Sequence, residues 1–373
     1  MTHPSAAPGG ESPPSPPPPR PVRHLSGAHH VSGAGRTVLT LRQLRAHGVA
    51  PSAVTARCRP GGPWQLLLPG VVLLRSGPVT DEERLHAALL YTVGRAPEPA
   101  GDPAAPGADA GRPPDRYGPA MITGLAALAL HHFASAPPLP SLDQVDVLVP
   151  RTRRLRSTGY VRVVRGPSLP PPEDVAGVPT APVPRALADA VDRIPEAAVV
   201  RGLLLEAVRG GHCEATAVVR ELSRCRLLTR PHVADAAEAV LAEGRAVAEG
   251  RLYAMVRRHR LPEPLWNVTL RLPGGPLVGD VDAYWPDQAV ALHLDMRPDG
   301  CAPDLAQGRV ARTRERLERL GITVVRVAPD RLREAPADQA TVVRTALMAA
   351  AGLLLAAGPG ESGPAVRVVV LPR

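Results

Sequence analysis

The amino-acid sequence predicts an α+β protein of several domains, with an N-terminal winged helix-turn-helix, an α/β middle domain and an α/β domain near the C-terminus. Three observations favour this class. The chain has 373 residues, 44% of them hydrophobic, which is enough for two or three modest cores. Two short helices with capping signals precede an apolar hairpin. Farther along, apolar strand-like runs are flanked by amphipathic helical runs.

Residues 1–34 are expected to form a disordered, proline-rich arm. The segment contains PPSPPPPRP and then small polar residues, a composition that favours solvated polyproline II over a packed core. Its few arginines and histidines are candidates for phosphate contacts, but a solvated tail explains them as well.

The charge of the chain points to a polyanionic partner. The formal net charge is +9 at pH 7, the sequence pI is near 10.3, and all 44 basic residues are arginine because the sequence has no lysine. This balance favours double-stranded DNA over a membrane as the partner. A GC-rich genome produces the same lysine-free composition without selection for binding, so this alternative stays open.

Cysteine spacing and hydropathy argue against a zinc-binding, disulfide-rich, secreted or membrane-spanning protein. The four cysteines lie far apart, without the spacing of a zinc site or a disulfide-dense pattern. The most apolar runs, such as ALMAAAGLLLAA, are shorter than a membrane span, and no signal-peptide pattern opens the chain. We therefore expect a cytoplasmic protein with reduced thiols.

Residues 35–80 predict the winged helix-turn-helix. Thr40 is the expected N-cap of the helix LRQLRAHG, which ends at Gly48. Ser52 is the expected N-cap of AVTARCR, and Pro60-Gly61-Gly62 ends that second helix. The apolar runs WQLLL and VVLL then form a hairpin around the turn Pro69-Gly70.

The second helix is the candidate DNA-reading element, because in this geometry it enters the major groove. The side chains expected to face DNA are Ser52, Thr55, Arg57 and Arg59, and those expected to pack inward are Leu41, Leu44 and Val54. A further basic candidate is RTRRLR at residues 151–156, where Arg151, Arg153 and Arg154 are the expected DNA contacts. Without that role, the stretch is a solvated loop between strands.

The order of elements from residue 36 to 192 carries a first resemblance. After the helix-turn-helix come DEERLHAALLYTVG, ITGLAALALHHF, VDVLVPRTRRLRSTGYVRVVR and GVPTAPVPRALADAV. This order resembles type IV toxin–antitoxin antitoxins of the AbiE family, in an actinobacterial form. The resemblance implies an antitoxin-like α/β domain over residues 81–194 with an insertion at 96–119, and a cognate toxin or other protein as a partner. Residues 195–245 are amphipathic at helical period and are expected to form a helical bridge.

Three runs near the C-terminus carry a second resemblance: EGRLYAMVRRHRLPEPLWNVTL, GDVDAYWPDQAVALHLD and ITVVRVAP. They resemble the very-short-patch-repair-like branch of the PD-(D/E)XK nuclease superfamily. The resemblance implies a restriction-endonuclease-like α/β domain over residues 246–352, followed by a C-terminal tail at 353–373.

Such nucleases hold a divalent cation beside the scissile phosphate with acidic side chains. By the resemblance, Glu249, Asp282 and Asp295 occupy catalytic positions, and Asp282 and Asp295 are the expected metal ligands on adjacent strands. His293 stands where the family has an acid. Either the imidazole binds Mn²⁺ or Zn²⁺, or the site has lost its metal and the fold survives as a binding module. A third alternative is that Asp280, Asp282 and Asp295 are only polar residues at strand ends, without any chemistry. Mg²⁺ or Mn²⁺ is expected as a cofactor only in an active site.

These patterns support three functions. We interpret the chain as a DNA-binding transcriptional regulator or antitoxin-like protein with an inactive nuclease-like domain, because replacing a carboxylate removes an oxygen ligand and a negative charge. The alternative is a metal-dependent DNA endonuclease that the winged helix targets to its substrate. A third possibility is a protein-interaction role for the middle domain.

Overall fold

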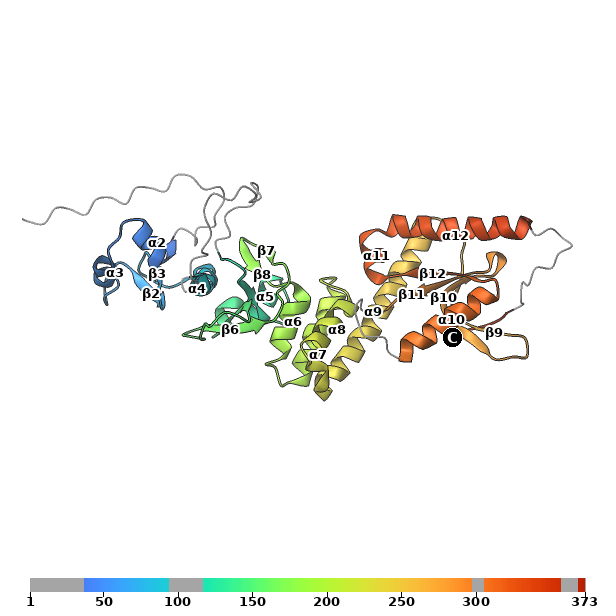
Figure 1. Ribbon diagram of the computed structural model, residues 1–373, viewed down its shortest axis with the longest axis horizontal. Coiled ribbons are helices and arrows are strands. Elements are labelled where there is room, and N and C mark those ends of the chain that lie inside the picture. Colours follow the sequence, from blue (N-terminus) through green and yellow to red (C-terminus); the bar gives the residue numbers. More distant parts are fainter. Residues whose placement is uncertain (1–36, 94–116, 297–304, 357–367, 373) are drawn as a thin grey trace, which may run out of the picture.

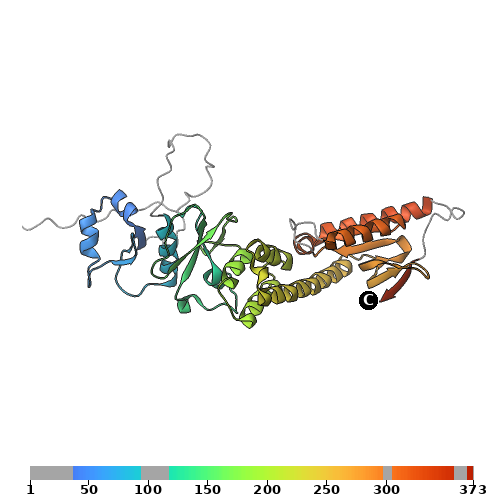
Figure 2. The same cartoon turned by 60° about the horizontal axis from the view of Figure 1, so that its bottom comes forward.

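The computed structural model describes residues 37–93, 117–296, 305–356 and 368–372. Within these ranges the protein is a mixed α/β structure with eleven α-helices and three sheets. Both views show an elongated molecule with α2 and α3 at one end and the C-terminal sheet at the other (Figures 1 and 2). The proline-rich arm and most of the expected insertion at 96–119 lie outside the described residues.

The N-terminal part combines two short helices with a small antiparallel sheet. The helices are α2 (Leu41–Ala46) and α3 (Pro51–Arg57), and the sheet has the order β1-β3-β2 with β1 (Val38–Thr40), β2 (Gln65–Leu68) and β3 (Val71–Leu73). Thr40 caps α2 as predicted: its hydroxyl accepts from the N–H of Gln43 at 3.2 Å, and the Gln43 amide oxygen accepts from the N–H of Thr40 at 2.8 Å. Gly48 follows the helix with a φ of +77°.

The second helix begins earlier than the sequence predicts. Ala50 is its N-cap and Pro51 its first helical residue, so the expectation that Ser52 caps this helix is wrong. Proline suits the first helical position because its fixed φ is helical and its missing N–H would have no partner there. Leu44 and Val54 are buried against Val72 of β3, which makes a small separate core.

The middle part is built on a five-stranded sheet of order β6-β5-β4-β8-β7. Its strands are β4 (Met121–Thr123), β5 (Val145–Pro150), β6 (Val161–Gly166), β7 (Glu173–Val175) and β8 (Val178–Thr180), and its helices are α4 (Asp81–Val93), α5 (Gly124–Leu130) and α6 (Val183–Val191). Strands β5 and β6 are parallel, although only residues 151–160 connect them. This connection is shorter than the crossover of roughly a dozen residues that parallel neighbours usually need.

Helices α7 (Ala197–Arg209), α8 (Ala215–Arg224) and α9 (Pro231–Arg258) follow. The expected boundary between a helical bridge at 195–245 and the next domain at 246 falls inside the continuous helix α9. One continuous hydrophobic cluster runs from Val38 to Val240 and joins the first sheet, the middle sheet and these helices. From Ala248 onward, α9 packs in a different cluster, which belongs to the C-terminal part. A single helix therefore contributes to two cores.

The C-terminal part is a second five-stranded sheet, of order β12-β11-β10-β9-β13. Its strands are β9 (Leu265–Arg271), β10 (Leu277–Trp285), β11 (Val290–Leu294), β12 (Thr323–Val327) and β13 (Val369–Pro372), and the helices after α9 are α10 (Leu305–Arg319), α11 (Pro329–Glu334) and α12 (Pro336–Ala356). Strands β9, β10 and β11 form an antiparallel meander, and α10 connects β11 to its parallel neighbour β12. Helices α9 and α12 pack on one side of the sheet and α10 on the other (Figure 1).

The end of the chain differs from the expected tail. The segment 353–373 includes the last turn of α12 and strand β13, which pairs antiparallel with β9. Of the described helices, none is long and apolar enough to cross a membrane.

At Gly244, helices α8 and α9 approach each other closely. A Cβ atom built on Gly244 lies 2.4 Å from the Cβ of Ala215, the first residue of α8. We expect Gly244→Ala to lower the free energy of unfolding by about 1–3 kcal/mol because of overpacking, even though alanine is intrinsically the better helix former by roughly 1 kcal/mol. Urea unfolding followed by circular dichroism measures the change.

Gly250→Ala is the matched control on the same helix. Gly250 is exposed, and a Cβ atom built there meets nothing within 4 Å. This substitution should leave stability unchanged or raise it by up to about 1 kcal/mol. Equal effects of the two substitutions would contradict the close packing at Gly244.

Candidate functional site

The first candidate site is the exposed surface of α3 and the turn that follows it. Ser52 and Thr55 lie exposed one helical turn apart, and Arg59 is exposed just after the helix ends. Arg57 is only half-buried, and its guanidinium stacks 4.6 Å from the ring centre of Trp64. The Thr55 hydroxyl donates a hydrogen bond to the Pro51 carbonyl at 3.1 Å. Three of the four predicted side chains, Ser52, Thr55 and Arg59, are therefore exposed to solvent.

The turn after α3 is tight and holds Trp64 in place. A Cβ atom at Gly62 would lie 2.2 Å from the carbonyl oxygen of Arg57, so this position requires glycine. The backbone N–H of Trp64 donates to the same carbonyl at 3.1 Å. The Trp64 ring is consequently fixed beneath the Arg57 side chain.

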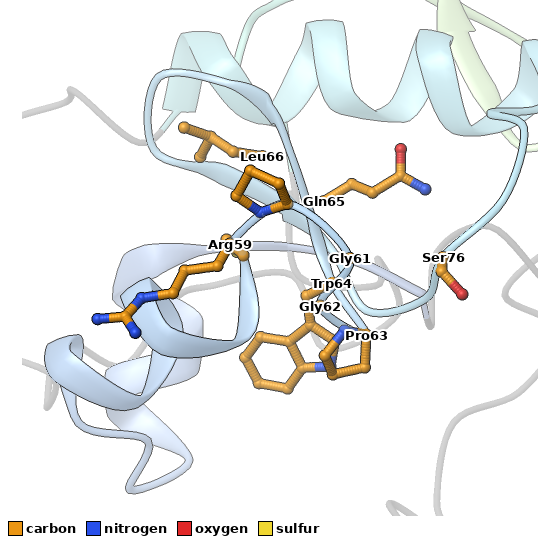
Figure 3. A pocket seen from close by; sticks show the side chains of 10 residues that line it. Arg59, Gly61, Gly62, Pro63, Trp64, Gln65, Leu66 and Ser76 are labelled. Atoms are coloured by element: carbon orange, nitrogen blue, oxygen red, sulfur yellow. The ribbon is translucent and has the colours of Figure 1, made fainter.

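An open pocket of about 680 Å³ lies beside this turn (Figure 3). In Figure 3 the Arg59 side chain extends to one side of the pocket and Ser76 lies at the other. Its lining residues are Cys58, Arg59, Pro60, Gly61, Gly62, Pro63, Trp64, Gln65, Leu66 and Ser76. Leu66 is 60% exposed, so the pocket combines a basic group with apolar surface.

The surrounding surface is basic because acidic residues are missing from the sequence there. Residues 37–77 include five arginines and no aspartate or glutamate. Arg75 is neutralised by Glu83 of α4, at 2.5 Å. In the part of the chain that the structure describes, Arg42, Arg45 and Arg59 form no ion pair, and all three are exposed. Sequence reasoning missed Arg42 and Arg45, although their spacing of three on α2 places them on one exposed face.

The second basic candidate is the connection between β5 and β6. Arg151 and Arg154 are exposed, while Arg153 is half-buried. The loop backbone is held by Arg165, whose side chain donates to the carbonyls of Arg153 and Leu155. The connection also reaches the first sheet, because a Cβ atom at Gly159 would lie 3.3 Å from the side chain of Leu68 in β2. These arginines thus lie on a fixed loop beside the N-terminal part.

The third candidate site is the acidic cluster of the C-terminal sheet, with Asp282 of β10 at its centre. Asp282 is 3% exposed, and its Oδ2 accepts from the N–H of Leu294 at 2.7 Å. Its Oδ1 accepts from Nη2 of Arg245 on α9. His293 lies on the neighbouring strand, with Nδ1 3.8 Å from Oδ2 of Asp282, while its Nε2 is buried with no hydrogen-bond partner among the described residues.

Glu249 joins this cluster through the same arginine. Nε of Arg245 lies 3.0 Å from Oε1 of Glu249, one turn farther along α9. The predicted residues Glu249, Asp282 and His293 do come together, but the Arg245 guanidinium lies between the two carboxylates.

The electrostatics of the cluster keep Asp282 ionised. Burial by itself would raise the pKa of Asp282. The contact with His293, the hydrogen bond from Leu294 and the charge of Arg245 outweigh burial, so the pKa lies below its ordinary value. An ionised buried carboxylate needs such compensation.

Asp295 is held separately. Asp295 follows the last residue of β11, the strand that pairs with β10 and therefore with the strand of Asp282, as predicted. The N–H of Asp295 donates to the carbonyl of Val327 at 2.9 Å. Its carboxylate pairs with Arg326 of β12.

The residues present do not fit a divalent metal ion. A hard cation needs several free oxygen ligands, but the carboxylates of Asp282, Glu249 and Asp295 each already pair with an arginine. Within the described ranges, no three His, Cys, Asp or Glu side chains are grouped to hold a metal. Sequence reasoning missed Arg245, although its spacing of four before Glu249 on one helix is a signal for an ion pair.

We expect Asp282→Asn to destabilise the protein by about 1–3 kcal/mol at neutral pH, because the Arg245 charge loses its buried partner. Since the folded-state pKa is lowered, the contribution of Asp282 is present above the unfolded-state value of about 3.9 and is lost as pH falls through the folded-state pKa. Unfolding of both proteins at neutral and acidic pH measures this. Glu243→Gln, at an exposed pair with Arg209, is the control and should change little. A difference that does not shrink in acid would contradict this account.

Comparisons with known proteins add no assignment: no protein-family model matches the chain, and no curated protein matches it. The candidate functions therefore rest on the residues and contacts described above.

Proposed function

We propose that this chain is a DNA-binding transcriptional regulator or antitoxin-like protein, whose N-terminal part is a winged helix-turn-helix that contacts duplex DNA. The single observation that carries the proposal is the N-terminal surface of exposed arginines without acidic residues. Arg42 and Arg45 on α2 and Arg59 after α3 lie in a 41-residue stretch, 37–77, with no aspartate or glutamate. Such a surface attracts phosphates and releases their counterions on binding.

Helix α3 has the dimensions for the major groove. An α-helix with its side chains is about 10–12 Å across, and the major groove, about 12 Å wide, admits it; the seven residues of α3 extend about 10 Å along the helix axis. Ser52 and Thr55 present short hydroxyl side chains on the exposed face, and such groups contact either phosphates or base edges. The Arg57 side chain is oriented by its stacking on Trp64, which favours a fixed contact over a mobile one.

We expect the β2–β3 hairpin to make fewer DNA contacts than a freely projecting wing would. The N–H of Leu41 donates to the carbonyl of Gly70 at 2.9 Å, so the hairpin turn lies against the start of α2. The proposed contacts therefore come from the two helices and from the turn that lines the pocket at Arg59 and Trp64.

For the C-terminal part we propose a restriction-endonuclease-like domain that does not cleave DNA. The element order α9, β9, β10, β11, α10, β12 supports the nuclease-like interpretation, because it agrees with the helix, strand and helix order expected from the sequence. The arginine partners of Glu249, Asp282 and Asp295 support the loss of cleavage, since each pair blocks an oxygen ligand.

Substitution of the N-terminal arginines should weaken DNA binding without unfolding the protein. We expect Arg42→Ala with Arg45→Ala to reduce the slope of log affinity against log salt by about 2, which is roughly 1 for each arginine that no longer binds a phosphate. Arg57→Ala with Arg59→Ala should also weaken binding. Fluorescence anisotropy with duplex DNA over a range of salt concentrations measures both effects.

The matched control is Arg209→Ala with Arg224→Ala on the bridge helices. Both arginines pair with a glutamate on the surface, far along the chain from α3. If Arg57→Ala with Arg59→Ala leaves the affinity for DNA unchanged, we expect the DNA-binding surface to be at Arg151, Arg153 and Arg154 instead.

Incubation of the purified protein with plasmid DNA tests the C-terminal proposal. With Mg²⁺, Mn²⁺ or EDTA, we expect a gel shift and no cleavage in each case. Robust Mg²⁺-dependent cleavage that Asp282→Ala abolishes would overturn the proposal and establish the metal-dependent endonuclease instead.

A further inference from the structure

The acidic cluster of the C-terminal sheet already contains a cation. Two carboxylates, from Glu249 on α9 and Asp282 on β10, face one guanidinium. We propose that Arg245 is the resident counter-cation of this cluster and takes the place that the nuclease resemblance assigns to a divalent metal ion. The inference rests on the nuclease-like interpretation of this domain.

The geometry shows one guanidinium bridging both acids. Nε of Arg245 faces Glu249 at 3.0 Å, and Nη2 donates to Asp282. The guanidinium presents its donors in a rigid planar fork, which suits simultaneous contact with two carboxylates. Its charge persists at every physiological pH, so deprotonation of the guanidinium does not release the carboxylates.

Packing of the bridge fixes the backbone that carries Arg245. Gly244 precedes it, and there the Cβ of Ala215 approaches so closely that a side chain at position 244 would overlap it. Six residues after Arg245, Arg251 pairs with the buried Glu214 at 2.7 Å, and Glu214 also pairs with Arg333 of α11 at 3.1 Å. Helix α8 is thus attached to α9 on both sides of Arg245.

The burial of the cluster makes a cation necessary. Asp282 is 3% exposed, and only 33% of the Arg245 side chain is exposed. Two neighbouring carboxylates in such a place repel each other and lose hydration unless a positive charge lies between them. Removal of the guanidinium leaves Glu249 and Asp282 without their positive charge, and we expect these side chains, with His293 3.8 Å from Asp282, to move toward a divalent ion that replaces it.

The test compares metal responses of the full-length protein and of its variants. Thermal unfolding is measured in EDTA and in Mn²⁺, and Mn²⁺ binding is followed directly by the decrease of the free-ion electron paramagnetic resonance signal. We expect the native protein to show no Mn²⁺ binding and the same Tm in both solutions. Arg245→Ala should have a lower Tm in EDTA, bind Mn²⁺ and regain Tm with it, because ligands that bind only the folded state stabilise it.

Three control variants test whether the Mn²⁺ response of Arg245→Ala comes from the cluster of Glu249 and Asp282. Arg245→Ala combined with Asp282→Asn should lose the Mn²⁺ response, because a ligand is removed. Arg245→Lys should keep the cation and show no response. Arg251→Ala, on the same helix, should lower Tm through the Glu214 pair without creating a response.

Two results would overturn the proposal: Mn²⁺ binding by the native protein equal to that of Arg245→Ala, or no Mn²⁺ response in Arg245→Ala. If Arg245→Ala does not fold, Arg245→Gln is tested in its place and judged by the same outcomes. Mn²⁺ binding and Tm are measured without DNA. A negative result for Arg245 can therefore be distinguished from a loss of DNA binding or from cleavage of plasmid DNA, which test the proposed function.

Discussion

Helix α9 belongs to two hydrophobic cores at once, and the arrangement of the other elements depends on that constraint. Its first half packs with the bridge and middle sheet through Val240, and its second half packs with the C-terminal sheet from Ala248. The helix has 28 residues and is about 42 Å long, which separates the two sheets. Gly244 lies between the halves and lets α8 approach α9. Because the helix is continuous, the C-terminal sheet keeps a defined orientation to the bridge.

Arginine has two different roles at the two ends of the molecule. In the C-terminal part, Arg245 pairs with Glu249 and Asp282, and Arg326 pairs with Asp295. On the N-terminal surface, Arg42 and Arg45 face solvent with no acidic residue in the surrounding sequence. Guanidinium groups pair equally well with carboxylates and phosphates. The surroundings therefore decide which arginines are available to a polyanion.

The N-terminal surface is largely preorganised. Gly62 allows the turn after α3 to close on the Arg57 carbonyl, which sets Trp64 beneath the Arg57 guanidinium. The hairpin turn is bonded to the start of α2 at Leu41. Fixed side chains lose less conformational freedom on binding than mobile ones. On this surface Arg57 and Trp64 are the fixed side chains, whereas Arg42, Arg45 and Arg59 are exposed and form no ion pair within the described residues.

Local features could be predicted from the sequence alone, because they depend on neighbouring residues: the capping box at Thr40, the helix end at Gly48 and the hairpin at Pro69-Gly70. A resemblance also placed Glu249, Asp282, His293 and Asp295 in one site; the first three lie together around Arg245, whereas the Asp295 carboxylate pairs with Arg326. The position of Arg245 between the acids required the tertiary structure, since Arg245 and Asp282 are 37 residues apart and meet through the packing of α9 on the sheet. The same holds for β13, whose pairing with β9 is a contact between distant segments. Such contacts are set by how elements pack, which local patterns of residues do not encode.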